Sequence, residues 1–314
     1  MSDSKEQLKH ATTPDGELAA PSIIRTEGVS HVQRSNLRIA WEKFLRHRLA
    51  IASAVVLLFL SLLCFLAPFI APYEFDAIDL GNIRKPPSAG HILGTDALGR
   101  DLFTRLLYGG RISITIGLTA ALLGTTVGTL IGAVAGYYGG RIDNLLMRFT
   151  DLAYSIPTLP LIIVISAYAD TQAVGIVLII GLFSWMSTAR VVRGAILSVK
   201  ENEYVTAARA LGAKDGLIIT RHVLPNIFNS IVVGATLGVG YAIIVESSLS
   251  FLGLGVSPPT PTWGNMLMDS QATMATQPWL TIFPGMAILI TVLCVNFIGD
   301  GLQDALDPKR GVKR

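Results

Sequence analysis

Two residue patterns would indicate chemistry in this chain: histidines at metal-ligand spacing and a glycine-rich loop that binds phosphate. The histidine side chain gains or loses a proton near neutral pH and is a common metal ligand. The five histidines are His10, His31, His47, His91 and His222. None of them has a metal-ligand spacing such as H-E-x-x-H, and no Gly-Lys pair occurs that could belong to a G-x-x-x-x-G-K-[ST] phosphate loop. The sequence therefore predicts a protein that is not an enzyme, binds no metal and holds no cofactor.

Three carboxylates beside apolar segments are the remaining candidates for chemistry, because a charge inside a membrane is costly and serves a function. A secondary transporter driven by an ion gradient would use such groups to carry protons or sodium ions. Asp151, Glu246 and Asp300 lie near the ends of apolar segments, where water and headgroups can reach them. We expect solvated carboxylates rather than an ion relay, so the secondary transporter is the less favoured alternative.

Long apolar segments must position whatever site the chain carries. Apolar residues make up 51% of the chain and charged residues 15%. The hydrocarbon core of a bilayer is about 30 Å thick and requires roughly 20 apolar residues per helix. The candidate spans are residues 49–71, 112–136, 152–168, 174–189, 227–249 and 280–299. The sequence predicts an all-α integral membrane protein with about six transmembrane helices.

The segments outside the spans divide the chain further. Residues 1–35 are polar and predict a disordered cytoplasmic leader, whereas the apolar spacing in residues 36–48 predicts an interfacial amphipathic helix before the first span at 49–71. An external loop is expected at 72–111. Residues 112–305 then form a core of five helices that includes a cytoplasmic loop at 200–226, and residues 306–314 form a cytoplasmic tail.

Basic residues set the expected orientation, because they remain preferentially on the cytoplasmic side of a span. They precede the first span, surround residues 200–226 and end the chain, whereas residues 250–279 contain no Lys or Arg. Both termini are therefore expected in the cytoplasm. The external loop contradicts the rule, and its basic residues are Arg84, Lys85, Arg100, Arg105 and Arg111.

A ladder of small residues marks one face of the second span. Gly124, Gly128, Gly132 and Gly136 recur at every fourth position and permit a close approach of another helix. That helix could belong to this chain or to a partner subunit.

The stretch from Glu203 to Asn226 predicts two short helices joined at a glycine. Tyr204, Ala208 and Leu211 form an apolar stripe, and Gly212 can adopt the positive φ that ends a helix. Asp215 could cap a second helix, which Pro225 would limit. Three interpretations compete: helices on the lipid surface, a docking element for a cytoplasmic protein, and a DNA-binding helix-turn-helix. The last is the weakest, because membrane spans lie only a few residues away on both sides.

Residues 206–225, TAARALGAKDGLIITRHVLP, resemble the cytoplasmic signature loop of permease subunits in bacterial ABC importers. The pattern of that loop is Glu-Ala-Ala, three residues, Gly, nine residues, Ile, any residue, Leu and Pro. The matching positions are Ala207, Ala208, Gly212, Leu224 and Pro225. Thr206 replaces the Glu and His222 replaces the Ile. Residues 91–114, 248–267 and 299–309 resemble the dipeptide, oligopeptide and nickel permease family, in its second-permease (C-type) branch.

The resemblance implies a type I ABC importer permease in the bacterial inner membrane. It implies a heterodimer with a homologous sister permease, two cytoplasmic ATPase subunits that use ATP and Mg, and an external solute-binding protein. No nucleic acid is involved. The implied solutes are di- or oligopeptides, with nickel chelates, glutathione or opines as alternatives.

The resemblance also implies roles for individual residues. The loop that couples to the ATPases would contain Glu203, Tyr204, Ala207, Ala208, Leu211, Gly212, Leu224 and Pro225. Apart from the resemblance, four polar or aromatic residues in or beside the spans are candidates for a central pathway, with ordinary packing or interfacial anchoring as the alternative: Tyr154, Ser155, Trp185 and Glu246. The prolines stiffen the segment that contains Pro259, Pro261 and Trp263, which we expect to contact the binding protein, to cap the pathway, or to form a rigid loop that packs on the chain's own helices.

Overall fold

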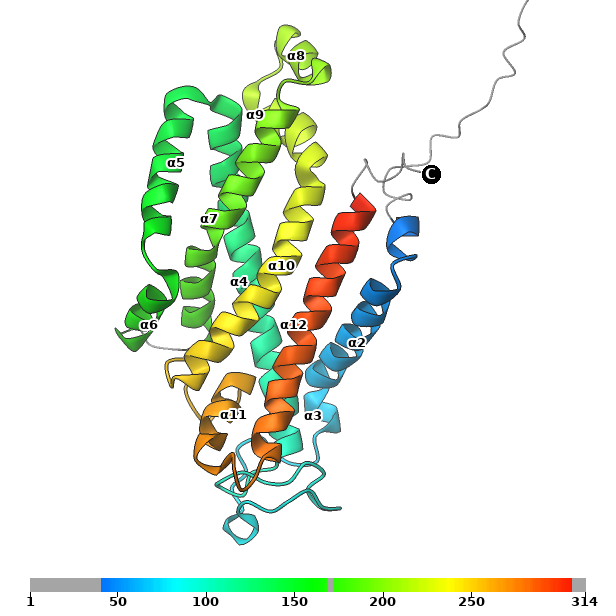
Figure 1. The fold of residues 1–314 in the computed structure, drawn as a ribbon, viewed down its shortest axis with the longest axis vertical. Coiled ribbons are helices and arrows are strands. Elements are labelled where there is room, and N and C mark those ends of the chain that lie inside the picture. Colours follow the sequence, from blue (N-terminus) through cyan, green and yellow to red (C-terminus); the bar gives the residue numbers. More distant parts are fainter. Residues whose placement is uncertain (1–40, 169–171, 307–314) are drawn as a thin grey trace, which may run out of the picture. The chain divides into compact units, whose positions relative to one another are not determined.

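The computed structural model describes residues 41–168 and 172–306, and within these residues the chain forms helices and no strand. Five helical segments are long and apolar enough to span a bilayer (Figure 1). They are α2 (Arg48–Phe65), α4 (Leu102–Tyr138), α7 (Ala173–Val199), α10 (Leu224–Phe251) with the turns that precede it, and α12 (Trp279–Leu306). The predicted all-α membrane class is confirmed.

The predicted span at 152–168 is broken into two helices. Helices α5 (Gly140–Ser155) and α6 (Thr158–Tyr168) meet at an angle of 77°. Pro157 lies at the break, where its ring disfavours a helical conformation of the preceding residue Ile156, which is extended with φ −86° and ψ 125°. The expected span at 152–168 therefore consists of the end of α5 and the helix α6, which is bent away from it.

The first span and the external loop have different limits from those expected. Helix α2 ends at Phe65 and a short helix, α3 (Ala67–Ile70), follows. Helix α4 begins at Leu102 rather than at residue 112, because the Asp101 carboxylate caps it by accepting a hydrogen bond from the Thr104 amide at 2.8 Å. Charged side chains in the first turns of α4 hid this start from a search for apolar segments.

The glycine ladder of α4 packs against α7 of the same chain. A Cβ atom on Gly128 would lie 2.6 Å from the Trp185 carbonyl oxygen, and one on Gly136 would lie 3.0 Å from the Ile196 Cβ. Such distances are too short for real side chains, so the glycines allow the two backbones to approach. Intrachain packing thus accounts for the ladder.

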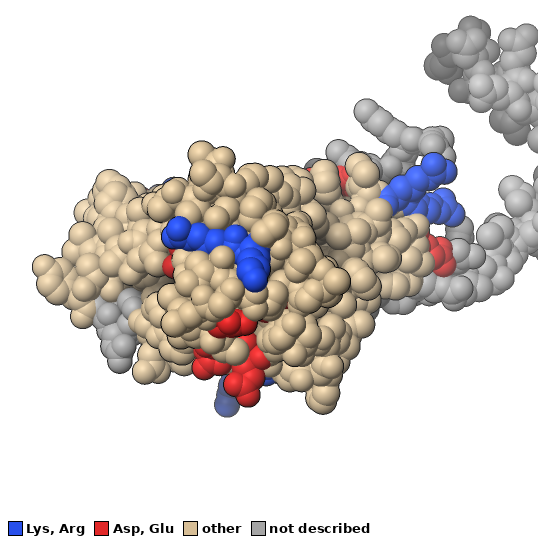
Figure 2. Space-filling view, turned by 90° about the horizontal axis from the view of Figure 1, so that it is seen from below, with Lys and Arg blue, Asp and Glu red and all other residues tan. Residues whose placement is uncertain are grey.

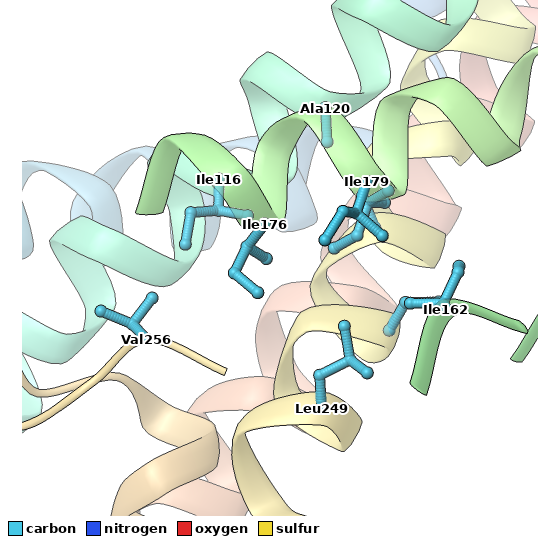
Figure 3. Packing of buried hydrophobic residues seen from close by; sticks show 10 residues of the cluster. Ile116, Ala120, Ile162, Ile176, Ile179, Leu249 and Val256 are labelled. Atoms are coloured by element: carbon cyan, nitrogen blue, oxygen red, sulfur yellow. The ribbon is translucent and has the colours of Figure 1, made fainter. Parts of the chain in front are cut away.

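Apolar side chains from several helices fill the centre of the bundle. Figure 3 shows Ile116 and Ala120 of α4 with Ile176 and Ile179 of α7, all buried in one cluster. Ile162 of α6, Leu249 of α10 and Val256, which follows α10, complete the labelled group. This cluster fixes α4, α7 and α10 against one another.

Short elements occupy the two ends of the bundle (Figure 1). At one end lie α8 (Glu203–Ala210), α9 (Asp215–Ile218) and a π-helical turn, η2 (Ile219–Val223). The other end carries α3, α11 (Trp263–Ser270) and the one-turn helices η1 (Leu80–Asn82) and η3 (Gln271–Thr273).

The described ends of the chain meet beside the α8 end of the bundle. Residues 41–44 are helical, and the rings of Trp41 and Phe44 stack with centroids 6.1 Å apart. Gly301 of α12 packs against Ala50 of α2 and the Phe44 ring. The expected interfacial helix at 36–48 ends at residue 44, because residues 45–46 form a turn and α2 begins at Arg48. Residues 36–40 of that helix, the leader at 1–35 and the tail after residue 306 lie outside the described residues.

Candidate functional site

The first candidate site is the segment of α8, the turn at Gly212 and α9, which we name the coupling loop. Gly212 has a φ of +81°, as its place after α8 predicted. The amide of Ala213 donates to the Ala208 carbonyl at 3.1 Å, so the turn satisfies a carbonyl at the end of α8. A Cβ atom on Gly212 would meet no other atom, so only its backbone conformation requires glycine.

The predicted apolar stripe of α8 is divided between the protein interior and the surface. Val205 is fully buried and Ala208 is half-buried, packed against Ile218 and Val223 beneath the coupling loop. Tyr204 and Leu211, the other two members of the predicted stripe, are 41% and 88% exposed. Helical periodicity identified an apolar stripe but could not decide which side of α8 packs against the rest of the chain. Both exposed side chains remain available to a partner.

The second helix of the coupling loop continues into the next span instead of ending before it. Lys214 caps α9, and Asp215 is its first residue rather than its cap. The chain then passes through η2 into α10 without a break, and the Leu224 amide bonds to the Ile219 carbonyl across a π-helical turn. Pro225 lies in the first turn of α10 and does not end the helix, because the wider turn before it accommodates its missing amide donor.

Tyr137 at the end of α4 holds the coupling loop to the bundle. Its hydroxyl donates to the Asp215 carboxylate at 2.7 Å, and the Arg209 guanidinium lies 5.6 Å from the centre of its ring. The Tyr137 side chain is itself buried. One aromatic side chain thus contacts both helices of the coupling loop, and the sequence analysis did not identify it.

The second candidate site is a groove of about 550 Å³ between α7, α10 and the bend from α5 to α6. Hydroxyl groups dominate its polar lining, and among the described residues no Asp, Glu, Lys, Arg or His lines it. The hydroxyl residues are Tyr154, Thr158, Ser184, Ser187, Thr188, Ser230 and Tyr241. Gly234 and Gly238 of α10 also line it. The run Ser184 to Thr188 was the sequence signal that could have located this groove.

Charged residues join α5 to α7 beside the groove. The Arg190 guanidinium lies 4.3 Å from the centre of the Tyr154 ring and contacts the Asp151 carboxylate at 2.7 Å. One turn further along α7, Arg193 contacts both carboxylate oxygens of Asp143, at 2.5 and 2.6 Å. Both ion pairs face the α8 end of the bundle rather than its centre. The Asp151 carboxylate is exposed to solvent and forms an ion pair with Arg190.

Only one of the four candidate pathway residues lines this groove. Tyr154 does, whereas Ser155 is exposed at the end of α5 and donates to the Leu152 carbonyl. Trp185 is buried and stacks on Phe149 of α5 with ring centroids 6.1 Å apart. Glu246 is fully buried between helices, so the expectation that it is solvated near a span end is wrong.

The three predicted contact residues after α10 differ in exposure. Pro259 is exposed, but Pro261 and Trp263 are buried, and Trp263 has no exposed surface at all. The Trp263 indole donates to the Leu106 carbonyl of α4 at 3.0 Å. Of the two expectations for Trp263, packing on the chain's own helices is the one that its burial supports.

Two arginines of the predicted external loop lie in a buried ion-pair network. Arg100 contacts Asp96 at 2.6 Å and Asp269 of α11 at 3.3 Å, and Arg105 contacts the same two carboxylates at 3.5 and 3.7 Å. Partial burial raises the pKa of the Asp269 carboxyl above its ordinary value, and the two guanidinium groups oppose that rise. Figure 2 shows this end of the molecule, where few charged side chains are visible among neutral ones.

Two family models match the chain. Residues 128–312 match the binding-protein-dependent transport system inner membrane component. Residues 35–87 match the N-terminal transmembrane domain of oligopeptide transport permease C. The first match includes the coupling loop, the groove and α11, and the second includes α2.

Curated relatives cover nearly the whole chain. The glutathione transport system permease protein GsiD of Pectobacterium atrosepticum is 41% identical over 293 residues, which are 93% of this chain and 96% of the relative. The dipeptide transport system permease protein DppC of Bacillus subtilis is 39% identical over 313 residues, 98% of both chains. A chain of the MetNI methionine ABC transporter, solved in inward-facing conformations, shares the fold with a TM-score of 0.53 at 18% identity, covering 64% of this chain and 96% of that one.

Proposed function

The chain belongs to the family of binding-protein-dependent transport system inner membrane components, and from this premise we propose that it forms half of the channel of a peptide importer. It is a multi-pass permease subunit of the inner membrane and is not itself catalytic. The other half of the channel is a homologous sister permease. Two ATPase subunits that consume ATP and Mg bind on the cytoplasmic side, and a solute-binding protein binds outside.

The exposed apolar tip of the coupling loop is the observation that carries the coupling mechanism. Leu211 is 88% exposed beside the turn at Gly212, at the end of the bundle that the basic residues place in the cytoplasm. A side chain of this size is stabilised when a partner covers it. We infer that the tip inserts into a depression on an ATPase subunit. Closure of the ATPases would then displace α8 and, through Tyr137 and the continuous helix into α10, move both α4 and α10.

The groove is the proposed wall of the solute pathway. Its hydroxyl groups can exchange hydrogen bonds with peptide amides and carbonyls, while the absence of charged lining residues leaves neither end of a zwitterionic peptide trapped. A surface of this kind favours passage over tight binding. Tyr154 is the one pathway residue predicted from sequence that belongs to it.

Short peptides are the proposed solutes, and glutathione, itself a modified tripeptide, is the second candidate. The relatives named above are a dipeptide permease and a glutathione permease, and the hydroxyl-lined groove suits the backbone that both solutes share. The groove contains no group that would discriminate between them by charge. Selection between the two would then fall to the binding protein.

Uptake by vesicles that contain the complete complex tests this function. Labelled dipeptide should accumulate only with ATP and binding protein, and an excess of unlabelled dipeptide should compete more strongly than glutathione. Stronger competition by glutathione would favour the second candidate. If neither solute is accumulated or competes, peptide import is the wrong assignment.

A further inference from the structure

Glu246 of α10 is a carboxylate with no exposed surface inside the helix bundle. Ser250 donates to one of its oxygens at 2.7 Å, and Ser113 of α4 donates to the other at 3.0 Å. Ser247 lies 3.4 Å from the second oxygen. Within residues 41–168 and 172–306, no Lys, Arg or His forms an ion pair with it. Hydroxyl groups are thus its polar neighbours.

The hydrogen bonds around Glu246 reach the start of α11, in the external part of the chain. The Trp263 amide donates to the Ser113 hydroxyl at 3.3 Å, and that hydroxyl in turn donates to Glu246. Thr262 caps α11 in a reciprocal capping box with Asn265. The first turn of α11 therefore connects through Ser113 to the buried carboxylate.

The backbone of α11 lies directly on α10 at the same place. A Cβ atom on Gly264 would lie 2.6 Å from both the Ser247 carbonyl oxygen and the Ser250 Cβ. Trp263 itself packs against Gly110 of α4, where a Cβ would lie 2.6 Å from the indole ring. Helices α4, α10 and α11 therefore meet around one polar side chain.

A carboxylate is a costly choice for such a position unless its hydrogen bonds serve a purpose. An apolar side chain would fill the same volume without removing a polar group from water. A carboxylate differs from an apolar side chain by offering two acceptor oxygens. Here one oxygen accepts a hydrogen bond from Ser113 of α4 and the other accepts one from Ser250 of α10. The observed geometry uses both oxygens.

We propose that Glu246 is a positioning residue that fixes the first turn of α11 to α4 and α10, so that this external helix moves together with the two spans during transport. The inference rests on the proposed function and adds to it the residue that joins the external end to the moving spans. Solute would reach the groove only when α11 follows the displacement of α4 and α10. Without the carboxylate, α11 would separate from them.

Cys64 is a built-in reporter of this attachment. Its thiol is buried against Gly110, in the same cluster as Trp263 and Met266 of α11. We compare Glu246→Leu, which removes the acceptors, with Glu246→Gln, which keeps an amide that can hydrogen-bond. Ser248→Ala is the matched control, because the exposed Ser248 hydroxyl bonds only within α10, to the Ile244 carbonyl. All variants carry Cys294→Ala, so that Cys64 is the single thiol of this subunit, and its modification is read on the isolated subunit band.

The expected result has two parts. In Glu246→Leu, a membrane-impermeant thiol reagent should modify Cys64 at least ten-fold faster than in the parent complex. Uptake and ATPase stimulation by the binding protein should fall by a similar factor while basal ATPase activity is retained. Glu246→Gln should remain within about two-fold of the parent in every measurement, and Ser248→Ala should not differ from it.

Three outcomes would overturn the proposal. One is a Glu246→Leu complex that transports normally with Cys64 protected. Another is lost transport with Cys64 still protected, which would give Glu246 a different role. The third is a Glu246→Gln variant as defective as Glu246→Leu. If Glu246→Leu does not assemble, Ser113→Ala, which cuts the link to the Trp263 amide, should expose Cys64 in the same way, and a protected thiol there rejects the proposal. Thiol labelling needs no transported solute, so it separates this failure from a wrong solute assignment.

Discussion

Single residues in this permease are constrained either by backbone conformation or by burial, and the two constraints make different predictions. Gly212 has open space around it but a positive φ. Trp263 does not have a positive φ, but its side chain has no exposed surface. The first residue concerns the shape of the coupling loop. The second concerns the packing of the external end.

Gly212→Leu should abolish transport while the chain still inserts into the membrane. A side chain at a φ of +81° costs about 1 kcal/mol or more, which is enough to shift the turn that presents Leu211 to the ATPase. The measurement is co-purification of ATPase subunits together with vesicle uptake. Gly216→Ala is the control, because Gly216 is helical, has open space and should tolerate a methyl group. Normal uptake by Gly212→Leu would refute the coupling assignment.

Trp263→Ala should reduce the stability of the permease rather than its binding to an external partner. Removing a fully buried aromatic side chain costs about 3–5 kcal/mol, and the indole hydrogen bond to Leu106 is lost as well. The midpoint of thermal unfolding in detergent should fall clearly. An unchanged midpoint combined with weaker binding-protein stimulation would restore the contact role that burial argues against.

Among the elements, α4 connects the two ends of the subunit. Its first turn carries Arg105 of the external ion-pair network, Ser113 hydrogen-bonds to Glu246, and Tyr137 at its end contacts the coupling loop. Its glycines lie against α7 between these points. A movement at one end of α4 therefore reaches the other end through a single helix.

Gly128→Leu should force α4 away from α7. The Cβ alone would lie 2.6 Å from Thr188 and from the Trp185 carbonyl, so at least about 1–3 kcal/mol of overpacking is expected. Thermal stability of the purified subunit measures the effect. Gly194→Leu places the same side chain on α7 where its Cβ meets nothing, and it should be well tolerated. Equal effects of the two substitutions would contradict the packing argument.

Tyr137→Phe should weaken coupling without preventing assembly. It removes the hydroxyl bond to Asp215, a loss of about 1 kcal/mol, but keeps the buried ring and its contact with Arg209. We expect solute uptake per ATP hydrolysed to fall a few-fold. The neighbouring Tyr138→Phe is the matched control, since Tyr138 is half-exposed and forms a ring contact with Tyr137. A ratio that stays constant in Tyr137→Phe would exclude this role for the hydroxyl.

On the scale of the whole molecule, the ion-pair network explains how basic residues can lie at the external end. Arg100 and Arg105 are buried and share the carboxylates of Asp96 and Asp269. Their charges are largely neutralised within the fold, and the orientation signal of the other basic residues remains. We therefore expect the coupling loop and the loop after α10 on opposite sides of the membrane.

Cysteine labelling in intact spheroplasts tests that orientation. Ala275→Cys lies in an exposed turn between η3 and α12 and should react with a membrane-impermeant thiol reagent. Lys214→Cys in the exposed coupling loop should react only after the membrane is permeabilised. Thr262 lies in the same segment without Lys or Arg (residues 250–279), but a cysteine there would not report the orientation, because Thr262 is fully buried. The reverse labelling pattern would invert the orientation of the subunit.

The sequence by itself determined the membrane class, the approximate spans, the family resemblance and the turn at Gly212. Each of these depends on local information: apolar length, the spacing of a motif, or the conformational freedom of one residue type. The broken helix at Pro157 and the early start of α4 at Asp101 were also local, but a search for uninterrupted apolar segments passes over both.

Only the tertiary structure decided where polar and aromatic side chains point. Glu246 near the end of an apolar segment could face water or the interior, and the choice depends on Ser113, which is 133 positions away. Trp263 could equally cover a surface or fill the core until α4 provides Gly110 beside it. Arg105 remained an exception to the charge rule until Asp269 of α11 lay next to it. Periodicity identifies a face of a helix, but the neighbours of that face come from distant segments, so burial and pairing follow from packing rather than from local sequence.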